Sequence, residues 1–134
     1  MASIIDYSLP ENKVAEKVIG LCIEVHRELG PGLLESIYEE AVAYELTNAG
    51  IRFSRQKEIP VSYKGNPLSI AFRADFIVDE LIVLEIKSVE MLAAVHAKQL
   101  ATYLTLTRLR LGLLINFNEY LLRDGLRRVV NNLQ

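Results

Sequence analysis

The chain of 134 residues has one cysteine, no tryptophan, no long apolar run and no excess of basic charge. Its single cysteine, Cys22, cannot form an internal disulfide, which suits the reducing cytoplasm and predicts a plain core thiol. No stretch approaches the roughly 18 consecutive apolar residues of a membrane span. The start, residues 1–6, lacks the basic and then apolar pattern of a secretory signal. We therefore expect a cytoplasmic protein with no membrane partner.

The charge balance is slightly acidic, with 15 Lys and Arg against 17 Asp and Glu and a formal net charge of −2. A strongly basic domain would indicate nucleic-acid binding, and this chain is not one. Acidic residues that belong to a metal site would be offset by the bound cation. The charge balance therefore weakens the case for a nucleic-acid partner without excluding it.

Repeats, low-complexity tracts and flexible linkers are also absent, so residues 1–134 form one predicted domain, with an N-terminal tail (1–9) and a C-terminal extension (119–134). Apolar periodicity predicts helices over residues 10–29, about 31–48 and about 93–109. Strands are predicted within 52–63, over 72–78, 82–87 and 111–117, and near 126–130. This order predicts an α/β fold, a mixed sheet flanked by helices.

The second predicted helix has an apolar core stripe and a second stripe that flanks it. Its apolar stripe of Leu34, Ile37, Ala41 and Tyr44 is predicted to face the core. Glu35 lies on the neighbouring stripe, so we expect it to reach the edge of the sheet without being buried.

Residues 73–87 are apolar and β-branched on both sides of a short acidic break at Asp79 and Glu80, which predicts a β-hairpin. Glu85 and Lys87 are two residues apart and therefore point to the same face. A carboxylate and an ammonium among apolar residues are costly unless they are paired or bind something. The hairpin is therefore the candidate site.

The register of this hairpin decides what faces Glu85, because a shift by one residue moves every side chain to the other face. If Val78 pairs with Leu81, Asp75 faces away from Glu85; if Val78 pairs with Ile82, Asp75 lies opposite Glu85. We adopt the second register because it also collects seven apolar side chains on one continuous face. These are Phe72, Ala74, Phe76, Val78, Ile82, Leu84 and Ile86.

Two carboxylates on adjacent strands with a nearby lysine suit metal-assisted phosphodiester hydrolysis. Carboxylate oxygens are the usual protein ligands of Mg²⁺, which activates water and polarises phosphate. A lysine beside the metal can orient the attacking water and balance developing negative charge. On these residues alone, a buried structural ion pair is an equal alternative.

Segments along most of the chain, over residues 19–117, resemble the GxxExxY protein family. Its signature is spelled by Gly32-Leu33-Leu34-Glu35-Ser36-Ile37-Tyr38. Further segments that carry the resemblance are Glu24-Val25-His26, Leu29-Gly30-Pro31-Gly32, Arg55-Gln56-Lys57, Gln99-Leu100, Tyr103-Leu104 and Gly112-Leu113-Leu114-Ile115-Asn116-Phe117. That family is similar to the PD-(D/E)XK nuclease superfamily, which implies a restriction-endonuclease-like core, a mixed four-stranded sheet between helices.

The resemblance implies roles for individual residues. Asp75 corresponds to the aspartate of the motif, Glu85 to its second acid and Lys87 to its lysine. Asp75 and Glu85 would bind Mg²⁺ or Mn²⁺ together with the carbonyl of Ile86. Glu35 would complete the metal site directly or through water, and Lys87 would position the nucleophile.

The third predicted helix contributes supporting residues. Gln99 and Tyr103 look like a Gln-xxx-Tyr motif, in which Gln99 would brace the site, whereas Tyr103 is expected to pack. His96 is expected at the surface or in a cap, and His26 as a structural imidazole. One departure from the motif is Ala74, which stands where the superfamily has proline.

The implied function is cleavage of DNA or RNA. Two alternatives remain: a non-catalytic nucleic-acid-binding or assembly module with the same fold, and a structural interaction protein whose acids form a satisfied network. A homodimer also remains open. Five basic residues near the predicted site offer a path for a phosphate backbone: Arg52, Arg55, Lys57, Lys64 and Arg73.

Overall fold

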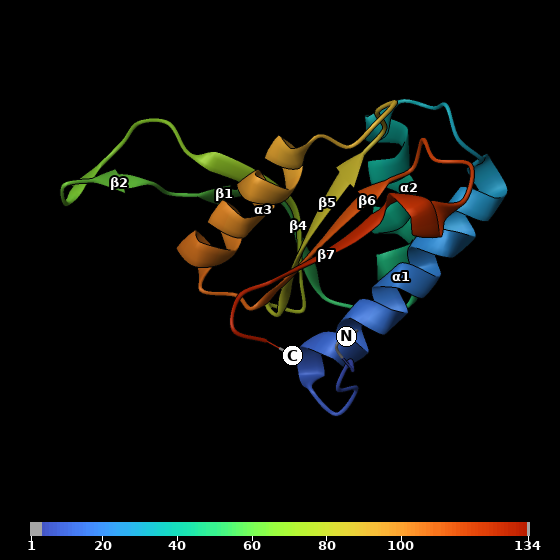
Figure 1. Ribbon diagram of the computed structural model, residues 1–134, viewed down its shortest axis with the longest axis horizontal. Coiled ribbons are helices and arrows are strands. Elements are labelled where there is room, and N and C mark those ends of the chain that lie inside the picture. Colours follow the sequence, from blue (N-terminus) through green and yellow to red (C-terminus); the bar gives the residue numbers. More distant parts are fainter. Residues whose placement is uncertain (1–3, 134) are drawn as a thin grey trace.

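The computed structural model describes residues 4–133, so residues 1–3 of the predicted tail and residue 134 lie outside it. Its centre is a mixed sheet with helices on both faces (Figure 1). This is the predicted α/β architecture. Within the described residues, no helix combines the length and the apolarity of a membrane span.

Helix α1 spans Pro10–Leu29, as predicted, and proline occupies its first turn, where its missing N–H is not needed. Helix α2 spans Glu35–Asn48, and α3 spans Ala94–Thr107. The predicted start of α2 at residue 31 is wrong. Gly32 has a φ of 93°, a left-handed conformation outside the helical region, so the helix begins only after the turn.

Within residues 4–133 the sheet has five strands in the order β1-β4-β5-β6-β7. They span Phe53–Ile59, Phe72–Val78, Ile82–Lys87, Leu111–Asn116 and Leu126–Val130. Strands β5 and β6 are parallel and are joined by α3, whereas the other neighbours are antiparallel. The predicted C-terminal strand thus extends the expected four-stranded core by one.

A two-stranded arm, β2 (Ser62–Tyr63) and β3 (Asn66–Pro67), connects β1 with β4 and projects from the body (Figure 1). Pro60 lies at the start of this arm, and Lys64 and Gly65 form the turn between its two strands. The arm leaves the sheet at the end of β1 and the start of β4, only a few residues from Asp75.

Two apolar clusters hold the layers together. Side chains of α1 and α2 pack on one face of the sheet, and Leu100, Tyr103 and Leu104 of α3 pack on the other. Helix α3 approaches β6 closely at Gly112, where a Cβ atom would lie 2.8 Å from the Leu100 side chain. Glycine at this position therefore lets the crossover helix lie flat on the sheet.

The predicted core face of α2 is wrong for three of its four residues, whereas the fourth, Ala41, is partly buried and packs against the core. Leu34, Ile37 and Tyr44 are exposed, whereas Tyr38, Val42 and Leu46 are fully buried. The helix is apolar on both stripes, so periodicity did not distinguish the buried one. Glu35 consequently begins the stripe that faces the sheet.

The predicted hairpin register is confirmed, because Val78 pairs with Ile82 and Phe76 with Leu84. The single continuous apolar face is wrong for Phe72 and Ala74. Both pack in the cluster of α3, while Phe76 packs in the cluster of α1 and α2. Ala74 and Phe76 are two residues apart, so strict alternation would place both side chains on one face of the sheet. Because they pack in opposite clusters, strand β4 changes face at Asp75.

Candidate active site

The β4–β5 ladder stops pairing backbone to backbone beside Asp75 and Glu85. The N–H of Ile86 donates to Oδ2 of Asp75 at 2.8 Å, and the N–H of Asp75 donates to Oε2 of Glu85 at 3.1 Å. Two side-chain carboxylates thus take the places of backbone carbonyls. The two predicted acids are held against each other at the point where the strands separate.

Glu85 is buried, only 6% exposed, on the face that α3 covers. Burial, followed by the negative charge of Asp75 and a side-chain hydrogen bond with it, raises the pKa of Glu85 to about 9. The charge of Lys87 opposes this shift. Glu85 therefore holds a proton at neutral pH, and removing it would leave two adjacent anions in a poorly solvated place.

Lys87 ends β5 beside the start of α2, where Glu35 stands. Partial burial raises the pKa of Glu35, the charge of Lys87 lowers it, and the charge of Asp75 raises it again. A hydrogen bond with the Ser88 backbone also favours the ionised carboxylate. Glu35 is thus within electrostatic reach of Lys87 and Asp75 while it stays solvent-accessible.

The Tyr38 side chain fixes the loop that brings Glu35 to this place. Its hydroxyl donates to the Gly30 carbonyl and accepts the Leu33 N–H at 3.1 Å, which closes the turn before α2. The ring stacks on Phe117 with centroids 4.7 Å apart. Because Glu35 and Tyr38 are three residues apart, the buried tyrosine fixes the direction in which the glutamate points.

The loop after Lys87 is tied to strand β6 by the buried Asn116. Its side chain accepts the Val89 N–H at 3.0 Å and donates to the Val89 carbonyl at 2.9 Å. The Phe117 N–H donates to the Lys87 carbonyl at 2.8 Å. The backbone is therefore held at Lys87 itself and two residues beyond it.

On α3, Tyr103 is buried and packs edge-on against Phe72, as its predicted packing role requires. Burial, and then the charges of Glu85 and Asp75, raise the pKa of its phenol to about 12, which places it close to the acid pair. Gln99 lies one turn away on the solvent side, so its bracing role stays a prediction. His96 has the expected capping role, since its Nδ1 accepts the Ala93 N–H at 3.1 Å.

Two other predicted structural residues are satisfied in the fold. His26 donates from Nε2 to the Glu119 carbonyl at 2.8 Å. Cys22 is fully buried, and this burial raises the pKa of its thiol to about 12. Both residues therefore have structural roles in the fold, and neither is part of the candidate site.

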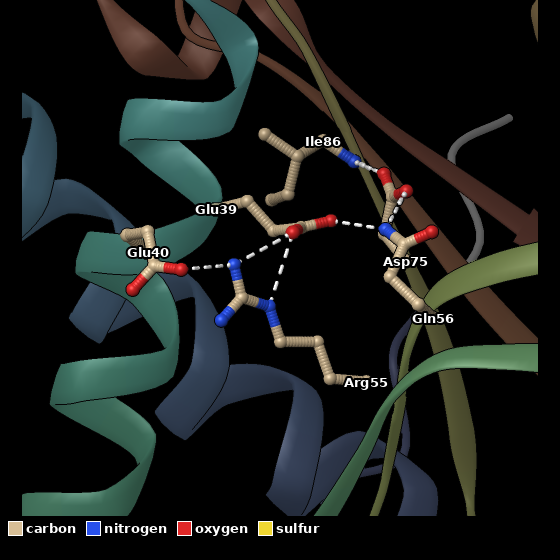
Figure 2. Close-up of polar contacts among 6 residues, drawn as sticks. All are labelled: Glu39, Glu40, Arg55, Gln56, Asp75 and Ile86. Atoms are coloured by element: carbon tan, nitrogen blue, oxygen red, sulfur yellow. Dashed lines mark hydrogen bonds and ion pairs between the residues drawn. The ribbon is translucent and has the colours of Figure 1, made fainter.

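Gln56 and Glu39 contact the site, although neither was a predicted site residue. The Gln56 amide donates to Oδ1 of Asp75 at 3.2 Å and also to Glu39 (Figure 2). The Arg55 guanidinium donates twice to Oε2 of Glu39, at 2.8 and 3.0 Å. Gln56 lies in the resemblance segment Arg55-Gln56-Lys57, but its place across from Asp75 follows only once strands β1 and β4 are paired.

The chemistry of the acid pair fits a divalent cation, although a complete cluster is not preformed. Asp75 and Glu85 supply carboxylate oxygens, and the Ile86 carbonyl faces the same strand edge as the Ile86 N–H that reaches Asp75. Oxygen donors of this kind are preferred by Mg²⁺ and Mn²⁺. Among residues 4–133, no three His, Cys, Asp or Glu side chains converge into a metal-binding group. Glu35 therefore stands apart from the pair.

A comparison with family models matches residues 12–129 to the PD-(D/E)XK nuclease superfamily. Searches of curated proteins and of solved structures gave no significant match. The matched span includes Asp75, Glu85 and Lys87, together with Glu35 and Gln99. The narrower resemblance to the GxxExxY proteins stays a prediction. Since the match covers most of the chain and the fold agrees with it, the chain belongs to the PD-(D/E)XK nuclease superfamily.

Proposed function

We propose that the protein hydrolyses phosphodiester bonds of DNA or RNA with the help of Mg²⁺ or Mn²⁺. The observation that carries this proposal is the pairing of Asp75 with Glu85 beside Lys87. Burial and an adjacent acid raise the pKa of the Glu85 carboxyl to about 9, so the fold holds two acids together at an electrostatic cost. Strongly perturbed acids of this kind are concentrated at functional sites.

In this proposal, Asp75 and Glu85 hold the cation, with the Ile86 carbonyl as a further ligand. Glu35 takes part through water, which suits its solvent-accessible place at the start of α2. A divalent ion bound there would polarise the phosphate and lower the pKa of a coordinated water.

Lys87 positions the nucleophile and balances negative charge on the phosphate. Its neighbourhood supports this role, because Asn116 and Phe117 hold the backbone on which it stands. Gln99 braces the site from α3. A lysine ammonium that is already in place contributes to catalysis because it needs no rearrangement when negative charge develops on the phosphate.

The path of the nucleic-acid backbone is proposed to follow Lys57 and Lys64. Three of the five basic residues considered above are engaged in ion pairs: Arg52 with Asp79, Arg55 with Glu39 and Glu40, and Arg73 with Glu58. None of the ion pairs found within residues 4–133 involves Lys57 or Lys64, and both side chains are exposed. These two lysines are therefore the more accessible contacts for phosphates.

One observation favours the alternative of a non-catalytic binding or assembly module. Every buried side-chain nitrogen and oxygen in the described part of the chain has a hydrogen-bond partner. The acid pair can thus exist without a metal, as a satisfied polar network. The homodimer and the cytoplasmic location stay predictions.

Incubation of the purified protein with single- and double-stranded DNA and RNA separates these functions. Each substrate is tested in Mg²⁺, in Mn²⁺ and in EDTA, beside Lys87→Ala and a matched control, Lys17→Ala, which alters an exposed lysine of α1. The proposal predicts metal-dependent cleavage that Lys87→Ala loses and Lys17→Ala keeps. Binding without cleavage on any substrate would favour the module.

A further inference from the structure

Gln56 occupies an unusual place in the middle of strand β1. Its φ is 52°, in the left-handed region, which residues other than glycine adopt at a conformational cost. Its neighbours Arg55 and Lys57 pair with Phe76 and Ala74, so Gln56 stands across from Asp75. Strain of this kind within an element is found preferentially at functional sites.

Strand β1 changes face at Gln56, as β4 does at Asp75. Phe53 packs with the cluster of α1 and α2, whereas Ile59 packs with the cluster of α3, although six residues should return to the same face. Adjacent residues of a strand normally point to opposite faces. Because the strand changes face here, the side chains of Arg55 and Gln56 both reach α2. The left-handed residue therefore turns the Gln56 amide toward Asp75 and Glu39 together.

The orientation of this amide follows from its surroundings. Both Asp75 and Glu39 present carboxylate oxygens, which only accept hydrogen bonds when they are ionised, so the NH₂ group must face them. Glu39 is itself held by Arg55, which also binds Glu40 (Figure 2). A continuous chain of hydrogen bonds thus runs from α2 through Gln56 to the candidate metal ligand.

We propose that Gln56 is a positioning residue, which orients the Asp75 carboxylate for cation binding. This inference rests on the proposed function. Gln56 holds Oδ1 of Asp75 and the Ile86 N–H holds Oδ2, so each oxygen of this carboxylate is fixed by a different donor. An amide suits this task better than a lysine or an arginine, because a neutral donor does not repel an incoming cation.

The substitution Gln56→Gly separates positioning from a purely structural role. Glycine removes the amide but accepts a φ of 52° without strain, so the melting temperature should stay equal or rise. Loss of a hydrogen bond that orients a ligand should weaken Mn²⁺ binding about tenfold, as measured by isothermal titration calorimetry. The matched control is Glu80→Gly, at another exposed left-handed residue, with φ 55° and no role at Asp75; its Mn²⁺ affinity should be unchanged.

A second variant, Gln56→Asn, keeps the amide and tolerates the left-handed conformation but is one methylene too short to span both carboxylates. It should weaken Mn²⁺ binding as Gln56→Gly does. If the wild type binds Mn²⁺ and both variants bind it equally well, Gln56 has no positioning role and the proposed function still stands. If the wild type binds no Mn²⁺, the inference and the proposed metal-dependent function are both overturned.

Discussion

Glutamine in place of Glu85 tests the physical basis of the acid pair. In the folded protein the pKa of Glu85 is raised to about 9, against an ordinary value of 4.5, by burial and then by the charge of Asp75. Between these two values the folded state holds a proton that the unfolded chain has released. The free energy of unfolding must therefore decrease as the pH rises through this window.

The size of this decrease follows from the difference of one bound proton between the folded and unfolded states over a given pH interval. Both pH 6 and pH 8 lie between the two pKa values, so the metal-free protein should lose about 3 kcal/mol of stability from pH 6 to pH 8. Glu85→Gln removes the titrating group, and its amide oxygen can still accept the Asp75 N–H. Between pH 6 and pH 8, the free energy of unfolding of the variant should therefore fall by about 3 kcal/mol less than that of the wild type.

Urea unfolding in EDTA at both pH values measures this difference directly. A suitable control is Glu90→Gln, which alters an exposed residue in the loop after β5 and should keep the pH dependence of the wild type. Added Mn²⁺ should stabilise the wild type more at pH 8 than at pH 6, because binding requires the deprotonated pair. Parallel pH profiles for wild type and Glu85→Gln would refute the assignment of a protonated Glu85.

Two further predictions concern the frame of the site. Tyr38→Phe removes the hydroxyl that joins the Gly30 carbonyl to the Leu33 N–H, and it should lower the free energy of unfolding by about 1–2 kcal/mol; an unchanged urea midpoint would contradict this role. Asn116→Ala removes the clamp on the Val89 backbone and should cost about 2–3 kcal/mol. Amide exchange at Val89 should then accelerate, and protection equal to that of the wild type would show that the loop is held in another way.

The hairpin could be predicted from the sequence because two independent requirements selected one register. Only the pairing of Val78 with Ile82 places Asp75 opposite Glu85 and also collects most apolar side chains on one face. The outcome for Phe72 and Ala74 differed because the strand changes face at Asp75. That switch is coupled to the left-handed conformation of Gln56, for which a glutamine gives no signal.

Helix α2 shows a second limit of prediction from the sequence. Leu34, Ile37 and Tyr44 form as good an apolar stripe as Tyr38, Val42 and Leu46, so hydrophobicity alone could not choose the buried one. The choice is made by tertiary packing, in which the Tyr38 ring stacks on Phe117. The same packing brings Glu35 beside Lys87, which local patterns could not show.

The position of Gln56 and Glu39 beside Asp75 depends on contacts between segments far apart in the sequence. Glu39 belongs to α2 and Gln56 to β1, and they meet only after the helix packs across the sheet. Their residue types are ordinary for exposed positions. The assignment of such supporting residues therefore requires the fold, whereas the acids and the lysine of the hairpin are recognisable from their apolar setting.

The central claim is tested most directly by the initial rate of metal-dependent cleavage by the wild type and by Lys87→Ala, with Mn²⁺ affinity measured on the same samples. We predict cleavage in Mg²⁺ or Mn²⁺ and none in EDTA. The rate of the variant should be lower by about 100-fold or more, while its Mn²⁺ affinity is retained. Cleavage by Lys87→Ala at the rate of the wild type, or cleavage that persists in EDTA, would contradict the account.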